Sequence, residues 1–173
     1  MTDDTDSVGG GSGAERGTSD EAGAAAVDAE SVLAAVDGPI LLFDGVCNLC
    51  NGTVRFVVDH DSTGRVSFAP LQSPVGRALL DHVGLPTDTL DSVVLLEGER
   101  YWRKSDAALR VARYLDAPLP AASVLEAVPE PIRNAAYDMV ADHRYRVFGR
   151  KDRCPVPDPE TRERFLDGSF PAE

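Results

Sequence analysis

Residues 40–50 have the sequence ILLFDGVCNLC, and this stretch decides the fold that we expect for the chain. Its first four residues, 40–43, are all apolar and predict a strand that is buried on both faces. Asp44 and Gly45 then form a turn signal. Beyond the turn, apolar residues recur at helical spacing and predict a helix that extends to about His60. A strand that passes through a short turn into a helix is the first unit of an α/β fold.

Further strand and helix signals follow this unit along the chain. Residues 65–69 alternate between apolar and polar side chains and predict a second strand. Pro74 stands where a first-turn proline would open a second helix. Residues 92–96 form the most strand-like segment, and the turn at residues 97–99 predicts a hairpin whose returning strand contains residues 101–102.

The C-terminal part of the chain is expected to be mainly helical. A helix capped by Ser105 or Asp106 follows the hairpin. Residues 117–148 then show helical spacing that is interrupted only by prolines, and a last short helix is expected near residues 162–166. The predicted fold class is therefore α/β, with a small mixed sheet flanked by helices and an added helical C-terminal segment.

The charge of the chain is unevenly distributed. The chain has 173 residues, of which 29 are acidic and 17 are basic, and its formal net charge is -12. Residues 1–37 contain nine of the acids and one base, and their first part is rich in Gly, Ser and Ala. Such a composition buries too little apolar surface to offset the entropy of ordering. We therefore predict a disordered acidic tail over 1–37 and one folded domain over 38–173.

Composition also argues against several classes of function. An acidic chain is a poor partner for nucleic acid, because binding to a duplex requires cations. No signal peptide is recognisable, and no apolar run reaches the roughly 18 residues of a membrane span. We therefore expect a cytoplasmic protein without a nucleic-acid or membrane partner. Lys104 and Lys151 are the only lysines, and this acidic, lysine-poor composition suggests a halophilic protein adapted to a high-salt cytosol.

Cys47 and Cys50 form a C-x-x-C pair where the first strand meets the first helix. Without a secretion signal, this spacing points to redox chemistry or to metal binding rather than to a structural disulfide. A thiol at a helix N-terminus faces unpaired backbone N–H groups, which favour the thiolate. We therefore predict that Cys47 is the nucleophile of thiol-disulfide exchange, and that Cys50, one turn further on, resolves the mixed disulfide.

Two other interpretations of the pair stay open. A closed zinc site needs four ligands, and Cys154 together with one of the three histidines would complete it if the fold brought them together. The cysteines could also be small buried residues of a binding module that does not turn over. The favoured interpretation assigns no metal and no cofactor besides the Cys47–Cys50 pair.

Asp44 lies three residues before Cys47 and has two candidate roles. Its carboxylate could exchange a proton with the resolving thiol as a general acid-base group. Alternatively, it could be an N-cap or turn residue that accepts hydrogen bonds from backbone N–H groups.

Cys154 stands at the end of a locally basic stretch. Residues 144–153 contain five bases and one acid. This stretch could contact an anionic substrate or, if it folds near Cys47, stabilise the thiolate and supply a third redox cysteine. The alternative is a solvated basic loop with an ordinary thiol.

The motif D-x-x-C-x-x-C, formed here by residues 44–50, resembles the signature of the DCC family of predicted thiol-disulfide oxidoreductases. Residues 67–72 (SFAPLQ), 103–109 (RKSDAAL) and 145–149 (YRVFG) are similar to later blocks of that family. The resemblance covers roughly residues 39–168. It implies a thioredoxin-like fold.

The expected substrates follow from the chemistry of the cysteine pair. The chain is expected to reduce a disulfide-containing protein or to react with a low-molecular-weight thiol, while an external dithiol reductant restores the cysteine pair. Ser105 and Asp106 resemble the place where glutaredoxins bind the ends of glutathione, and a helix N-terminus suits such an anion. Capping of the helix alone also explains both residues. Thioredoxins place a cis-proline before the strand that here begins near Val93, but the nearest proline is Pro86.

Overall fold

The structure is a computed structural model, and it describes residues 27–87, 92–149 and 159–166. Its centre is a four-stranded mixed sheet with the strand order β2-β1-β3-β4. The central strand β1 pairs in parallel with β2 and antiparallel with β3, and β3 and β4 form a hairpin. The strands are β1 (Ile40–Phe43), β2 (Ser67–Pro70), β3 (Val94–Glu97) and β4 (Arg100–Arg103).

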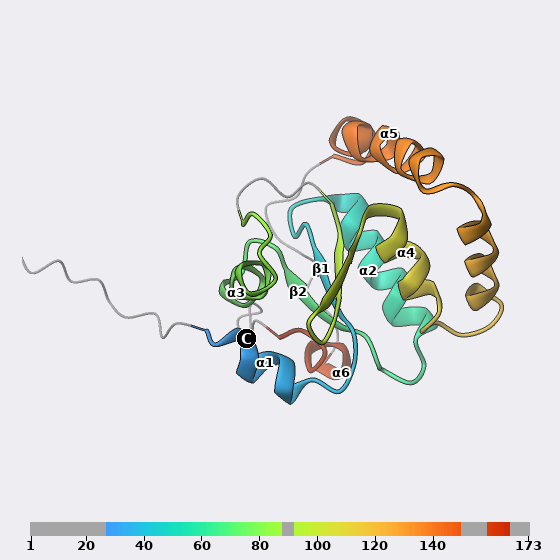
Figure 1. Cartoon of the computed structure of the whole chain (residues 1–173). Helices are drawn as coiled ribbons and strands as arrows, with labels where there is room; N and C mark the ends of the chain where they lie inside the picture. The colour runs from blue at the N-terminus through green and yellow to red at the C-terminus, as the bar shows by residue number, and fades with distance from the viewer. Residues whose placement is uncertain (1–26, 88–91, 150–158, 167–173) are drawn as a thin grey trace, which may run out of the picture.

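Helices cover both faces of this sheet (Figure 1). One face carries α2 (Asn48–His60) and α4 (Lys104–Ala112). The other face carries α1 (Ala29–Ala35) and α3 (Pro74–His82). This arrangement confirms the predicted α/β class with a small mixed sheet flanked by helices.

The burial of β1 follows from its position in the middle of the sheet. All four of its residues are buried. Leu41 and Phe43 belong to the apolar cluster under α2 and α4, whereas Ile40 and Leu42 belong to the cluster under α1 and α3. Successive side chains of a strand point to opposite faces, so a strand with helices on both sides needs an unbroken apolar run.

Helix α3 lies unusually close to strand β2. Its first turn is capped by the Ser73 hydroxyl, which accepts a hydrogen bond from the Gly76 N–H at 3.0 Å. A Cβ atom added to Gly76 would lie 2.1 Å from the carbonyl oxygen of Pro70. The close approach of this helix to the sheet therefore requires glycine at this position.

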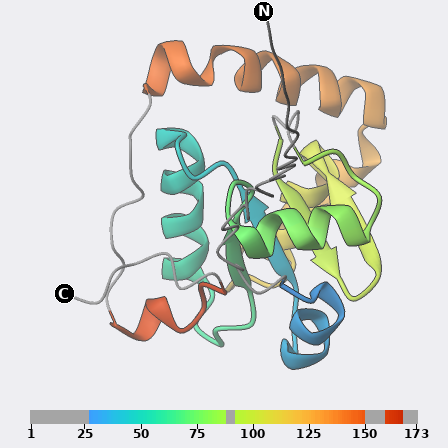
Figure 2. The same cartoon turned by 90° about the vertical axis from the view of Figure 1, so that its left-hand side faces the viewer.

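The C-terminal part adds helices beyond the sheet. A 3-10 helix, η1 (Leu119–Ala127), is followed by the long helix α5 (Glu130–Phe148) and the short helix α6 (Pro159–Arg162). Both views show α5 lying across one end of the layered domain (Figures 1 and 2). After α6, Phe165 forms a parallel bridge with Phe68, so this segment pairs with the outer edge of β2.

Three sequence-based boundaries are corrected by the structure. Helix α1 lies inside the segment 1–37 that was predicted to be disordered, so this prediction is wrong for residues 29–35; residues 1–26 lie outside the described residues. The last helix ends at Arg162 rather than beginning there. Neither Ser105 nor Asp106 caps α4, because the helix begins at Lys104 and its N-cap is Arg103.

Candidate active site

The end of β1 and the start of α2 position the two cysteines. β1 ends at Phe43, a short turn follows, and Cys47 is the N-cap of α2 with extended backbone angles (φ -91°, ψ 122°). Its side chain makes no capping hydrogen bond. Cys47 therefore lies at the helix N-terminus that the sequence predicted, beside the unpaired N–H groups of the first turn.

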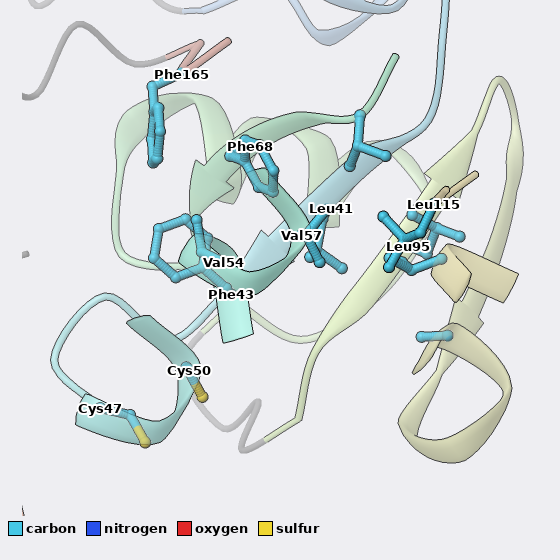
Figure 3. Packing of buried hydrophobic residues seen from close by; sticks show 13 residues of the cluster. Leu41, Phe43, Cys47, Cys50, Val54, Val57, Phe68, Leu95, Leu115 and Phe165 are labelled. Carbon is cyan, nitrogen blue, oxygen red and sulfur yellow. The ribbon is translucent and has the colours of Figure 1, made fainter. Parts of the chain in front are cut away.

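Cys50 lies one turn further along the same helix. Both cysteines are free of disulfide bonds, and both are buried: Cys47 is 0% exposed and Cys50 is 8% exposed. They lie at the end of the apolar cluster that contains Phe43 and Val54 (Figure 3). The pair is therefore held in a nearly dry environment.

This environment disfavours ionisation of Cys50. Burial, followed by the neighbouring Cys47 with its charge and its hydrogen bond, raises the pKa of Cys50 to about 12. Asp44 raises this pKa further, whereas Arg144 lowers it. Cys50 is consequently a protonated thiol at neutral pH and needs a base, or a favourable charge, to become a nucleophile.

Asp44 is buried beside this pair and both of its carboxylate oxygens are occupied. Oδ1 accepts hydrogen bonds from the backbone N–H of Val46 at 3.1 Å and from the side-chain amide of Gln72 at 2.9 Å. Oδ2 contacts the Arg144 guanidinium at 3.2 Å and accepts a hydrogen bond from the Tyr145 hydroxyl. Asp44 thus makes the turn contact that was one of its two predicted roles, but it is also part of a buried ion pair.

Three side chains that contact Asp44 had no role assigned to them from the sequence. Arg144 was counted within a basic stretch, yet in the structure its side chain is only 4% exposed. Gln72 and Tyr145 lay in two of the blocks that resemble the DCC family, without an assigned role. Those blocks were the available signal, because no short-range pattern links Asp44 to positions that lie 28 and 101 residues further along the chain.

Helix α5 also contacts the backbone around the site. The Asn48 side-chain amide donates to the carbonyl oxygen of Phe148 at 2.7 Å. The hydroxyl of Tyr137 accepts a hydrogen bond from the N–H of Val93, just before β3, at 3.1 Å. In both views α5 lies over the end of the sheet and of α2 where these residues are found (Figures 1 and 2). The helical extension is therefore part of the site.

Ser105 and Asp106, the predicted substrate-binding residues, also face α5. The Ser105 hydroxyl lies 2.6 Å from the Asn134 side-chain oxygen, and Asp106 forms an ion pair with Arg133 at 2.6 Å. These contacts join the start of α4 to α5. Binding of a low-molecular-weight thiol at these residues stays a prediction.

The other positions that the sequence singled out are Pro86, Cys154 and the histidines. The only cis peptide bond among the described residues is Ala117–Pro118, so Pro86 is not preceded by one. Cys154 lies outside the described residues, as do residues 150–153 of the basic stretch before it. His60 and His143 each contact a backbone carbonyl oxygen in their own helix.

Metal binding was the main alternative for the cysteines. Over residues 27–87, 92–149 and 159–166, no group of three or more His, Cys, Asp or Glu side chains is arranged to hold an ion. The zinc interpretation requires Cys154, whose placement is not described.

The sheet order, the helices on both faces and a C-x-x-C pair at the start of α2 define a thioredoxin-like protein with a redox-type dithiol motif. Comparison with known sequences identifies the group within this class. The family model described as DCC1-like thiol-disulfide oxidoreductase matches residues 41–150. The chain therefore belongs to the DCC1-like thiol-disulfide oxidoreductase family, as its motifs predicted.

Two relatives agree with this assignment. The chain is 46% identical over 127 residues to "Uncharacterized protein YuxK" of Bacillus subtilis (strain 168), which covers 73% of this chain and 93% of that protein. It is 48% identical over 119 residues to "DCC family protein At1g52590, chloroplastic" of Arabidopsis thaliana, which covers 68% of this chain and 69% of that protein. No solved structure matches the chain.

The structure also bears on the predicted absence of a membrane span. Among the helices in the described part of the chain, none combines the length and the apolar character that crossing a membrane requires.

Proposed function

We propose that this protein is a cytoplasmic thiol-disulfide oxidoreductase that reduces disulfides with the Cys47–Cys50 dithiol. The observation that carries the proposal is the placement of two thiols one turn apart at the N-terminus of α2, with Cys47 as its N-cap. The match to a family named for this activity supports it.

The reaction consists of two exchanges. The Cys47 thiolate attacks one sulfur of the substrate disulfide, and the other sulfur leaves as a thiolate that takes up a proton. The Cys50 thiol then loses its proton and attacks the Cys47 sulfur. The Cys47–Cys50 disulfide forms while the second substrate sulfur leaves with its electron pair. The substrate is reduced by two electrons, and an external dithiol reductant returns the enzyme to its thiol form.

Asp44 is proposed to take the proton of Cys50 during the second exchange. Its carboxylate is buried next to the pair and raises the pKa of Cys50, which indicates an electrostatic contact between the two groups. A buried thiol whose pKa is about 12 resolves slowly unless a nearby group accepts its proton.

The substrate is proposed to be a disulfide-containing protein or a low-molecular-weight thiol in its oxidised form. Either one must reach Cys47, which is fully buried in the structure. Access is proposed to involve a movement of the end of α5, whose Phe148 carbonyl oxygen accepts a hydrogen bond from Asn48, the residue after the nucleophile.

The test is a disulfide-reduction assay with a dithiol reductant on wild type, Cys47→Ser and Cys50→Ser. We expect Cys47→Ser to lose turnover and Cys50→Ser to accumulate a mixed disulfide that is detectable by mass spectrometry. An inactive wild type would refute the proposal, and stoichiometric zinc in that protein would support the metal-binding alternative. Cys154→Ser is measured in parallel to test the predicted third redox cysteine.

The proton role of Asp44 is tested separately with Asp44→Asn. We expect slower formation of the Cys47–Cys50 disulfide, because the amide cannot take the proton. Stability should fall by roughly 3 kcal/mol, since Arg144 would be left as a buried charge without its counterion. Unchanged exchange rates together with lowered stability would show that Asp44 only holds the turn.

A further inference from the structure

Arg144 is a buried cation next to the cysteine pair, and the two exchanges described above do not use it. Its Nη2 atom lies 3.2 Å from Oδ2 of Asp44, and the two side chains are only 4% and 7% exposed. Removing a guanidinium from water costs several kcal/mol. Its burial is therefore stable only because other groups at the site compensate this cost.

The contacts of Arg144 also fix the geometry of the carboxylate. Arg144 donates to the Tyr145 hydroxyl at 2.8 Å, and that hydroxyl donates to the same Asp44 oxygen. The other oxygen is held by Gln72 and by the Val46 N–H. The Asp44 carboxylate is therefore hydrogen-bonded to its own turn, to the segment after β2 and to α5. These contacts fix its orientation.

The charges around Cys50 oppose one another. Within the described structure, the groups that act on Cys50 are Cys47 on α2, Asp44 in the preceding turn, and Arg144 and Tyr137 on α5. Cys47 and Asp44 disfavour a Cys50 thiolate, and Arg144 favours it. In the mixed disulfide Cys47 carries no charge, so Asp44 and Arg144 become the opposed charges that decide how easily Cys50 ionises.

We propose that Arg144 is a positioning residue for the resolving step: it holds the Asp44 carboxylate in place and offsets its negative charge where the Cys50 thiolate forms. The inference rests on the proposed function. In that step the proton of Cys50 passes to Asp44, the Cys47–Cys50 bond forms, and the bond from Cys47 to the substrate sulfur breaks. As the proton moves, the negative charge passes from Asp44 to the Cys50 sulfur, and without Arg144 that charge would have no cation beside it in a dry site.

The experiment follows this step alone. An aromatic disulfide that releases thionitrobenzoate is mixed with the reduced full-length protein in a Cys154→Ser background. The first release reports attack by Cys47, and the second release reports resolution by Cys50. We expect Arg144→Gln to slow the second release about tenfold at neutral pH. The pH dependence of that rate should also shift by about one unit toward higher pH. Arg144→Lys, which keeps the charge, should recover most of the rate.

Arg133→Gln is the matched control. Arg133 also lies on α5 and also forms an ion pair with an aspartate of another element, Asp106, but it does not contact Asp44. Its loss should lower the melting temperature and leave the pH profile of the second release unchanged. A wild-type profile in Arg144→Gln, or the same shift in Arg133→Gln, would overturn the inference.

Two further outcomes keep this test decisive. If wild type shows no second release at all, the proposed function itself fails. If Arg144→Gln does not fold, Arg144→Lys decides: a tenfold slower release in that variant would show that the charge is not what matters, and a release within about threefold of wild type would support the proposal.

Discussion

Asp44 shows how far a single position could be understood from the sequence. Its turn contact with Val46 is local, and it was predictable because an aspartate commonly accepts a hydrogen bond from the N–H two residues later. Its ion pair with Arg144 is not local, because no short-range pattern links residues 100 positions apart. The turn contact of Asp44 was therefore predictable, whereas its buried ion pair was not.

The raised pKa of Cys50 makes the stability of the reduced protein depend on pH. The pKa of a cysteine in an unfolded chain is about 8.5. In the folded protein burial, and to a smaller extent the neighbouring Cys47, raises the pKa of Cys50 to about 12. Between these values the folded state binds more protons than the unfolded state. The stability that comes from the neutral thiol is thus complete below the unfolded pKa and is lost as the pH rises toward the folded pKa.

We therefore expect reduced wild type to lose about 1–2 kcal/mol more stability between pH 7 and 10 than Cys50→Ala does. Urea unfolding in the presence of a reductant measures this difference. The contributions of groups that do not interact with Cys50 cancel in the comparison. Parallel curves for the two proteins would show that Cys50 ionises normally in the fold.

At the scale of the elements, short-range sequence patterns predicted the helices and strands that such patterns define. β1, α2 and the β3–β4 hairpin were expected from an apolar run, a helical period and a turn, and all three are present. Helix α1 was missed because it follows an acidic, Gly-rich segment and has only seven residues. It is stabilised by packing with α3 in the cluster that includes Ala29, which the sequence pattern does not reveal.

Two glycines in helices predict opposite effects of the same substitution. Gly76→Ala should destabilise the protein by roughly 2 kcal/mol or more, because the new methyl group would lie 2.1 Å from the Pro70 carbonyl oxygen. Gly52→Ala should be neutral or stabilise by up to about 1 kcal/mol, because nothing lies within 4 Å of that position in α2 and alanine is the better helix former. Thermal or urea unfolding of the pair measures both changes.

The two variants control for each other, since each adds one methyl group inside a helix. A loss of stability in both would indicate that glycine is needed for helix geometry in general. A stable Gly76→Ala variant would show that α3 can move away from β2 at little cost.

At the scale of the whole molecule, α5 departs from the usual rule for a surface helix. Apolar residues of this helix such as Ile132, Met139 and Val147 are more than 60% exposed, while Arg144 is buried. An amphipathic helix normally packs its apolar side inward. Here polar groups face inward because the end of the domain that α5 covers presents Asp44, Asn48 and the start of α4. A hydrophobic pattern alone would have oriented this helix wrongly.

The position of α5 predicts how Cys47 becomes accessible. Tyr137→Phe removes the hydroxyl that accepts a hydrogen bond from Val93, and such a bond contributes about 1 kcal/mol. If α5 must leave Val93 for a reagent to reach the site, labelling of Cys47 by an alkylating reagent should accelerate about fivefold. Mass spectrometry of the labelled peptide measures the rate under native conditions.

Tyr101→Phe is the comparison variant, because its ring is exposed on β4 and it does not contact α5 through any of the hydrogen bonds described above. Its labelling rate should equal that of wild type. Equal rates in all three proteins would mean that Cys47 is reached without separating α5 from Val93.

The bridge between Phe165 and Phe68 also affects how copies of this chain meet in a concentrated solution. Sheets tend to recruit foreign strands at their open edges. Here the N–H and the carbonyl oxygen of Phe68, on the outer side of β2, are already bonded to residues 164 and 166. The opposite edge strand, β4, is only four residues long and has an exposed arginine at each end. The short segment after α6 therefore protects the sheet against self-association as well as completing its core.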